Sequence, residues 1–364
     1  MKVLVFSNIY PSKDAKTLGV FVKNFIKELD EIGIDYRKVV INMRSGKVGK
    51  IFSYISYFTR LLFFGLFSRH DIIYVHYASH NAWAVNFIKI FRRKTKVITN
   101  CHGSDVLPQT FIQEKSQSQV KKLLKRSYKV VVPSKYFKNV IYKRYNIDER
   151  KIYIYPSAGI NKDIFYKKEV DPSFLKKYGI DENKSYIGYV SRIAKDKGWD
   201  TFLYAYKKII CRNDDLNISA IIVGIGEEKE DFFNLVEKLE LKNDLIYIES
   251  LSQEELNNLY NLIDVFIFPT RREGESLGLV GIEAMATKTP VIGSDYAALK
   301  YIIKDGYNGF KFPFNDYEGL YDKVIEYFSL SNKEREKLSL NAYKTGEEFF
   351  TEKLRGNLEK IILE

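Results

Sequence analysis

Short apolar runs alternate along the chain with longer stretches whose apolar residues recur at helical spacing. In the first series, Val22, Phe25, Ile26 and Leu29 have this spacing, and Gly33 follows them as a stop signal. The strand-like runs of this series are VLVFSN, DIIYVHY, KVITNCHG and KVVVPS, and those of a second series are YIGYVSR, ISAIIVGIG, LIYIES, VFIFPT and PVIGS. Strands alternating with helices predict doubly wound parallel sheets, so the expected fold class is α/β.

The two series predict two Rossmann-like domains, and a length of 364 residues favours the same division. Two such domains facing each other would form a cleft at the carboxyl edges of their sheets, where open α/β sheets bind ligands. The polar segment between the series is the expected linker, and the C-terminal segment is expected to be a helix that packs back on the first domain. The expected boundaries are 1–165 for the first domain, 166–185 for the linker, 186–346 for the second domain and 347–364 for the last helix.

Composition is that of a folded soluble protein, with 45% hydrophobic and 29% charged residues. Two cysteines cannot form a disulfide framework, which favours a reducing cytoplasm. The N-terminus has neither the basic start nor the apolar core of a cleaved signal peptide. No run reaches the ~18–20 apolar residues of a transmembrane helix.

Charge is distributed unevenly along the chain. Residues 1–170 contain 32 basic and 12 acidic residues, a net +20, and the remainder contains 26 basic and 34 acidic residues, a net −8. Opposed charges in the two halves indicate domains with different partners, and the partner of the basic first domain is expected to be anionic. Anionic lipid, nucleic acid and a phosphorylated acceptor all fit this charge.

Two glutamates, Glu275 and Glu283, are separated by seven residues around the start of an expected helix. Carboxylates accept strong hydrogen bonds from the vicinal hydroxyls of a ribose or a hexose. The backbone amides of Ser276, Leu277, Gly278 and Leu279 lie at the start of that helix and suit an anion such as a diphosphate. Two glutamates near a helix start are also commonly capping residues, so the pair alone does not decide the function.

A second element, GYVSRIAKDKGWD, carries Arg192 and Lys197 on a short loop after a strand. Two cations at the carboxyl edge of a sheet can neutralise the oxygen of a departing phosphate. In the first domain, His102 follows a strand directly and can offer an imidazole to a ligand. Gly19, in the loop before the first helix, can bring backbone amides close to a phosphate, although turns also use glycine.

These segments, in this order, resemble the retaining glycosyltransferases of the GT-B fold, specifically the large family 4. The resemblance runs through HGSD, VVPSKYF, YPSAGINKDIF, VSRIAKDKG, IVGIGEE, FIFPTRREGESLGLVGIEAMA and PVIGSD. It implies that Arg192 and Lys197 hold the donor diphosphate and that Glu283 holds the ribose. It also implies that Glu275 and the following amides face the donor sugar, as does His102, and that Gly19 approaches the phosphates.

The resemblance implies transfer of a sugar from a nucleotide-sugar donor with retention at the anomeric carbon. No Asp-x-Asp pair occurs in the chain, so fixed cations and a helix start must stabilise the leaving group, and no metal or other cofactor is expected. Front-face attack by the acceptor hydroxyl is favoured, because no carboxylate of the first domain is identified as a nucleophile. A uridine diphosphate sugar is the expected donor.

The most apolar stretch, KVGKIFSYISYFTRLLFFGLFSRH, is expected to contain a helix with basic residues at its ends. Lying on anionic lipid and packing against the first sheet are equally compatible with its sequence. Basic clusters elsewhere in this half favour peripheral attachment to the inner face of the membrane and a lipid-linked glycan acceptor, as in cell-surface polysaccharide synthesis. The residues expected to take part are Lys47, Lys50, Phe52, Arg60 and Phe63.

Other classes of protein fit parts of the pattern. A nucleic-acid-binding protein would explain the basic half, but it would not explain the two glutamates of the acidic half. An epimerase or a phosphorylase of the same fold would share the architecture. His70, His76 and His80 lack the spacing of a zinc site, so no metal is expected there.

Overall fold

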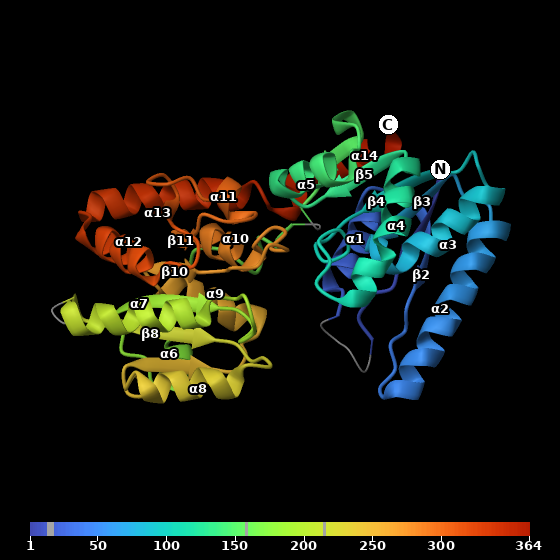
Figure 1. Cartoon of the computed structure of the whole chain (residues 1–364). Coiled ribbons are helices and arrows are strands. Elements are labelled where there is room, and N and C mark those ends of the chain that lie inside the picture. Colours follow the sequence, from blue (N-terminus) through green and yellow to red (C-terminus); the bar gives the residue numbers. More distant parts are fainter. Residues whose placement is uncertain (13–17, 157–158, 214–215) are drawn as a thin grey trace. The chain divides into compact units, whose positions relative to one another are not determined.

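The computed structural model describes residues 1–12, 18–156, 159–213 and 216–364. The chain divides into two compact units (Figure 1), one made of residues 1–159 and 354–364 and the other of residues 160–353. Each unit contains a six-stranded, all-parallel sheet with helices between successive strands. The predicted fold class, two doubly wound α/β domains, is therefore confirmed.

The sheet of the first unit has the strand order β2-β1-β3-β4-β5-β6. Its strands are β1 (Lys2–Ser7), β2 (Asp35–Val40), β3 (Ile72–His76), β4 (Lys96–Asn100), β5 (Lys129–Val132) and β6 (Ile152–Ile154). Its helices are α1 (Val20–Glu31), α2 (Lys47–Phe67), α3 (Ala78–Phe91), α4 (Phe111–Arg126), α5 (Lys135–Tyr145), the short 3₁₀ helix η1 (Glu149–Lys151) and the end of α14 (Thr351–Leu363). In register, Ser7 pairs with His76 and His76 with Asn100, so β1, β3 and β4 end side by side.

Alternate residues of β1 bury themselves in two different cores. Leu4 and Phe6 join the core beneath α2, α3, α4 and α5, whereas Val3 and Val5 join the core beneath α1 and α14. A strand that is apolar on both faces is the expected sequence of a parallel sheet covered by helices on each side.

The C-terminal segment packs on the first unit, as its burial shows. Leu358 and Ile361 are buried with Val3 and Phe25. The Lys129 ammonium donates to the Ile361 carbonyl at 2.9 Å, where it satisfies an unpaired carbonyl near the end of α14. The helix expected at 347–364 is α14, which begins four residues later, at Thr351, because α13 ends at Glu347.

The expected linker, residues 166–185, belongs to the second unit, and the division of the chain lies instead between residues 159 and 160. This segment contains the helix α6 (Pro172–Tyr178). It is held by the side chains of α9 (Gln253–Leu262), which accept hydrogen bonds from three of its backbone amides. Asn257 accepts from Tyr166, Asn261 from Lys168, and Asn258 from Asp171. The polar residues of segment 166–185 therefore belong to a segment that is docked on α9 and not to a free linker.

The sheet of the second unit has the strand order β12-β11-β10-β7-β8-β9. Its strands are β7 (Ser185–Val190), β8 (Ile218–Val223), β9 (Leu245–Ile248), β10 (Val265–Phe268), β11 (Val291–Ser294) and β12 (Gly309–Phe312). Its remaining helices are α7 (Trp199–Arg212), α8 (Lys229–Lys238), α10 (Leu279–Ala286), α11 (Leu299–Ile302), α12 (Tyr317–Ser329) and α13 (Asn332–Glu347). Helices α7, α8 and α12 share one core with Ile187 and Tyr189 of β7.

Among the described residues, no helix is both long and apolar enough to cross a membrane. The longest apolar helix, α2, instead buries one face and exposes another. Ser53, Tyr57, Leu61 and Gly65 are buried, and the exposed apolar residues of α2 are Val48, Ile51, Phe52, Ile55, Phe63 and Phe67.

Candidate active site

The sheet of the second unit changes direction between β7 and β10. These two strands are neighbours, and the chain proceeds from β7 outward to β8 and β9 but from β10 outward to β11 and β12. Loops that leave adjacent strands in opposite directions leave a crevice at the carboxyl edge of the sheet, where α/β proteins bind ligands. Residues 191–198 and 269–278 are those two loops.

The two loops meet through an ion pair between the predicted residues Lys197 and Glu275. The Lys197 Nζ lies 2.9 Å from the Glu275 Oε2, and the two side chains are only 12% and 14% exposed. The structure thus brings together a cation and a carboxylate that are 78 positions apart in the sequence. Because the pair is largely removed from water, removal of either partner leaves a charge that is poorly solvated.

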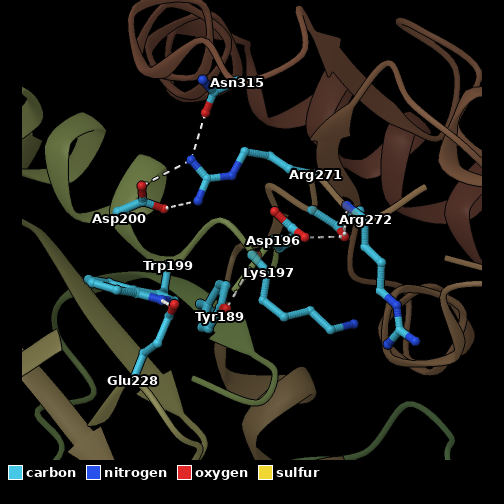
Figure 2. Close-up of polar contacts among 10 residues, drawn as sticks. Tyr189, Asp196, Lys197, Trp199, Asp200, Glu228, Arg271, Arg272 and Asn315 are labelled. Carbon is cyan, nitrogen blue, oxygen red and sulfur yellow. Dashed lines mark hydrogen bonds and ion pairs between the residues drawn. The ribbon is translucent and has the colours of Figure 1, made fainter. Parts of the chain in front are cut away.

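A second ion pair, not predicted from the sequence, braces the same loops (Figure 2). The Arg271 guanidinium donates to both oxygens of Asp200, at 2.7 and 3.0 Å, and to the side chain of Asn315 at 2.7 Å. The Arg271 backbone amide also donates to the Asp196 carbonyl at 2.8 Å. A bidentate pair fixes geometry as well as charge, so Arg271 positions the loop after β10 against the start of α7. The only sequence signal for it is the Arg271-Arg272 pair before Glu275.

Both helices that follow these loops begin at a glycine in the left-handed conformation. Gly198 has φ 75° before α7, Gly278 has φ 74° before α10, and neither helix has a side-chain cap. A Cβ on Gly198 would lie 1.8 Å from the Pro269 carbonyl oxygen, so only glycine fits there. Neither helix start is therefore capped by a side chain, and an uncapped helix start suits an external anion.

Glu283 lies within α10 and accepts a hydrogen bond from the Tyr260 hydroxyl at 3.1 Å. Its burial raises the pKa of the carboxyl to about 7, while the hydrogen bond from Tyr260 acts in the opposite direction. Glu283 therefore keeps its proton to a higher pH than an exposed glutamate does. A carboxyl in this state gains most from ligand hydroxyl groups, which stabilise its charged form.

The other residues predicted to bind the donor lie at the same edge of the sheet. Arg192 is exposed in the loop after β7 and makes no ion pair within the described part of the chain. Ser276 and Leu279 are half-buried and Leu277 is buried. The structure places these residues at the switch point but records no contact from Arg192 to Lys197.

In the first unit, the corresponding change of direction lies between β1 and β3. His102, after β4, bonds through its Nε2 to the Nδ1 of His76 at 3.1 Å. Phe21 covers His102, with ring centroids 4.4 Å apart. Burial lowers the pKa of His102 to about 3 and that of His76 well below its usual value, so both rings are neutral at pH 7. His76 was not expected to contact His102, because its position on a strand gave no such signal.

Asp105 has a structural role in this loop. Its Oδ1 accepts from the amides of His102 and Gly103, at 3.0 and 2.8 Å, and its Oδ2 accepts from Ala78 at the start of α3. Gly19 is the N-cap of α1, again without a side-chain cap, whereas residues 13–17 before it lie outside the described residues.

The residues expected to contact a membrane divide between two sides of α2. Lys47, Lys50, Phe52 and Phe63 are exposed, the two phenylalanines by 58% and 57%. Arg60 was expected among them, but its guanidinium donates to the Val40 carbonyl at 2.9 Å. It lies beside the buried face, where it satisfies a main-chain group, and so it does not belong to the exposed apolar surface.

Two family models together match most of the chain. The model described as Glycosyltransferase Family 4 matches residues 5–158, and the model described as Glycosyl transferases group 1 matches residues 170–345. An uncharacterized glycosyltransferase of Methanocaldococcus jannaschii is 28% identical over 99% of this chain and 97% of its own length. The capsular polysaccharide biosynthesis glycosyltransferase CapM of Staphylococcus aureus is 28% identical over 57% of this chain and 53% of its own.

Solved structures show the same fold over the whole chain. Sucrose-phosphate synthase from Thermosynechococcus elongatus has a TM-score of 0.77 at 17% identity, covering 99% of this chain and 98% of its own. HepE of Anabaena, solved in complex with UDP and glucose, has a TM-score of 0.73 at 15% identity, again covering 99% and 98%.

Proposed function

This chain belongs to the group 1, family 4 glycosyltransferases, and from that premise we propose that it transfers a sugar from a UDP-sugar to a lipid-linked glycan. The family is one of retaining, metal-independent enzymes, and the chain is accordingly a glycosyltransferase. The observation that carries the finer proposal is the buried pair of Lys197 and Glu275 beside the uncapped helix starts at Gly198 and Gly278. This arrangement offers a cation and amides to a diphosphate, and a carboxylate to a sugar.

The proposed reaction breaks the bond between the anomeric carbon and the oxygen of the β-phosphate. Negative charge develops on the diphosphate, and Lys197, Arg192 and the first-turn amides stabilise it. Positive charge develops on the sugar ring, whose hydroxyls Glu275 orients. The acceptor hydroxyl attacks from the same face and gives its proton to the leaving phosphate oxygen, so that the products are a nucleoside diphosphate and a glycoside.

Two relatives support the finer parts of this proposal. HepE has been solved with UDP and glucose, which supports a UDP-sugar donor, and CapM acts in capsular polysaccharide biosynthesis, which supports a cell-surface glycan. In this chain, Glu283 and Tyr260 would hold the ribose of the donor. None of the proposed contacts is to a metal ion, and the proposed location is the inner face of the cell membrane.

The donor is identified by a panel of nucleotide sugars in a thermal-shift assay. A donor present at 100 times its Kd stabilises the folded state by about 2.7 kcal/mol, since it binds only that state. UDP-sugars are expected to raise the Tm, and GDP-sugars and free sugars are expected to leave it unchanged. A rise in Tm with GDP-sugars alone would show that the donor carries guanine and not uracil. An unchanged Tm with every nucleotide sugar would contradict the proposed donor site.

Metal independence predicts full activity in excess EDTA. The proposed charge stabilisation comes from fixed cations and amides, so removal of divalent ions should leave the turnover rate unchanged. The measurement is release of nucleoside diphosphate with EDTA, and then after addition of Mg²⁺ or Mn²⁺. A rate that EDTA abolishes and either ion restores would contradict this mechanism.

Membrane attachment is proposed through the exposed face of α2. Between residues 36 and 104 the chain has twelve lysines and arginines but a single acidic residue, Asp71. Basic residues near a membrane contribute about 1 kcal/mol each toward anionic lipid, and exposed aromatic rings add apolar burial. We therefore expect the full chain to co-sediment with phosphatidylglycerol vesicles and to bind weakly to neutral ones.

Replacing Phe52 and Phe63 together by serine is expected to weaken this binding by at least about tenfold, since two exposed rings lose their burial in lipid. The matched control is Leu340→Ser, an exposed apolar residue on α13 of the other unit. Equal sedimentation of both variants, or equal binding to neutral and anionic vesicles, would show that this face of α2 does not dock on lipid.

A further inference from the structure

Helices α2, α3 and α4 enclose an apolar groove on the first unit. Its walls include Tyr54 and Phe58 from α2, Trp83 from α3 and Ile112 from α4, and its volume is about 250 Å³. The rings of Phe58 and Trp83 lie 5.0 Å apart across it. A second hollow of about 500 Å³ runs along α2 and shares Tyr54 and Phe58 with the first. The two hollows therefore adjoin at these two side chains, and together they are called the groove.

Large apolar side chains border the groove and are open to solvent. Ile112 is 72% exposed, Ile51 60%, Ile55 57% and Trp83 45%. Soluble proteins seldom leave so many neighbouring apolar groups in water unless the surface binds something. A ligand with a long apolar part would remove these side chains from water.

One polar residue of the groove lining is connected to the loop that carries His102. Gln113 lines the groove, and its Nε2 donates to the Tyr77 hydroxyl at 3.2 Å. The same hydroxyl shares a hydrogen bond with the Ser104 hydroxyl, two residues after His102. A ligand whose apolar part lies in the groove would therefore have its polar end next to this loop.

The charge around the groove is positive. Among the described residues that line the two hollows, Lys50 is the only one that is charged at neutral pH, because burial lowers the pKa of His80. Beside the groove, Lys47 on α2 and Lys115 on α4 are exposed cations, and Glu114 on α4 is an exposed carboxylate, so basic residues are in excess there. An amphiphile with an anionic head group matches both the apolar walls and this charge.

We propose that this groove binds the hydrocarbon chain of a phosphate-linked lipid acceptor and directs its head group toward the loop of Ser104 and His102. The proposal rests on the lipid-linked acceptor proposed above and adds the site that holds its chain. Binding in the groove is distinct from docking on a bilayer, because one chain enters a cavity of the protein in the absence of any vesicle.

Trp83 reports on the groove directly, since the chain has two tryptophans and the other, Trp199, is buried in the second unit. The probe is an alkyl phosphate with a bromine near the end of its chain, used below its micelle concentration. We expect saturable quenching of tryptophan emission in the full chain and loss of that quenching in Trp83→Phe. Inorganic phosphate should neither quench nor compete, because the chain supplies the affinity.

Two serines of α4 provide a matched pair of variants. Ser116 lines the groove, and Ser116→Phe should fill it and weaken probe binding by more than tenfold. Ser118 is exposed two residues further along and does not line the groove, so Ser118→Phe should bind as the wild type does. Equal affinity of Ser116→Phe and Ser118→Phe, or quenching that persists in Trp83→Phe, would overturn the assignment of the groove.

Turnover separates this proposal from the proposed function. Ser116→Phe should raise the KM for a lipid-linked acceptor while the KM for the donor, and the rate with a chain-free glycan acceptor, stay unchanged. If wild type transfers to both acceptors with equal KM, the groove proposal fails and the glycosyltransferase proposal stands. If no lipid-linked or chain-free glycan is glycosylated while the probe still binds in the groove, the proposed acceptor fails and the apolar site stands.

Discussion

Lys197→Met will lower kcat by roughly 10²–10³ with little change in the overall fold, the loss measured when one preorganised charge contact is removed from an active site. Lys197 lies at the point where the second sheet changes direction, and its ammonium is the buried cation of the loop after β7. The measurement is kcat with a saturating donor, with circular dichroism to verify folding.

The matched control is Lys195→Met, an exposed lysine in the same loop. Because its charge is in water and is screened, its loss should change kcat by less than about twofold. Wild-type turnover in Lys197→Met, or equal losses in both variants, would contradict the proposed role of Lys197.

Variants of the Lys197–Glu275 ion pair are expected to separate the loss of stability from the loss of activity. Lys197→Met leaves the Glu275 carboxylate, which is 14% exposed, without its partner, and loss of one member of a buried pair costs roughly 3–5 kcal/mol. The double variant Lys197→Met with Glu275→Gln carries no unpaired charge, so its Tm should recover while its activity stays low. An inactive double variant with a recovered Tm shows that the Lys197–Glu275 pair acts in the reaction and not only in holding the loops. A double variant that regains activity would show the opposite.

Glu283→Gln is expected to weaken donor binding by roughly 10–100-fold, which corresponds to the 1.5–3 kcal/mol of hydrogen bonds to a charged group. The wild-type carboxyl has a pKa of about 7 in the free protein, so its affinity for a UDP-sugar should rise as the pH increases from 6 to 8. The variant has no such titration, and its weaker affinity should be independent of pH in this range. Calorimetric titration of both proteins with the UDP-sugar measures this difference.

The same group predicts the opposite trend for the stability of the ligand-free protein. Between its ordinary pKa of 4.5 and about 7, Glu283 holds more protons in the folded state than in the unfolded state. The contribution of Glu283 to the free energy of unfolding is therefore complete below about pH 4.5. It is lost as the pH rises through 7, and the loss is at most about 3 kcal/mol. In denaturant unfolding, the stability of wild type should fall relative to that of Glu283→Gln between about pH 4.5 and 7, and the two pH dependences should be parallel below and above this window. Identical pH profiles of stability and binding in both proteins would show that Glu283 does not titrate near neutrality.

The α/β fold followed from the sequence because the alternation of apolar runs and helical spacing is local. VLVFSN and KVVVPS needed no partner to indicate buried parallel strands, and β1 and β5 are those strands. The order of strand, loop and helix likewise placed Lys197 and Glu275 at strand ends. The linker could not be read in the same way, since residues 166–185 are polar and yet dock on the asparagines of α9.

What the sequence determined by itself was the class of fold, the family and the identity of the charged residues after each strand, because these depend on residue type and on near neighbours. The tertiary structure alone decided which of them meet: Lys197 with Glu275, Arg271 with Asp200, and His102 with His76. It also decided that Arg60 bonds a main-chain carbonyl and that the apolar face of α2 continues into a groove with α3 and α4. Such contacts depend on the packing of distant segments and on exclusion of water, and neither property is contained in the local pattern of a chain.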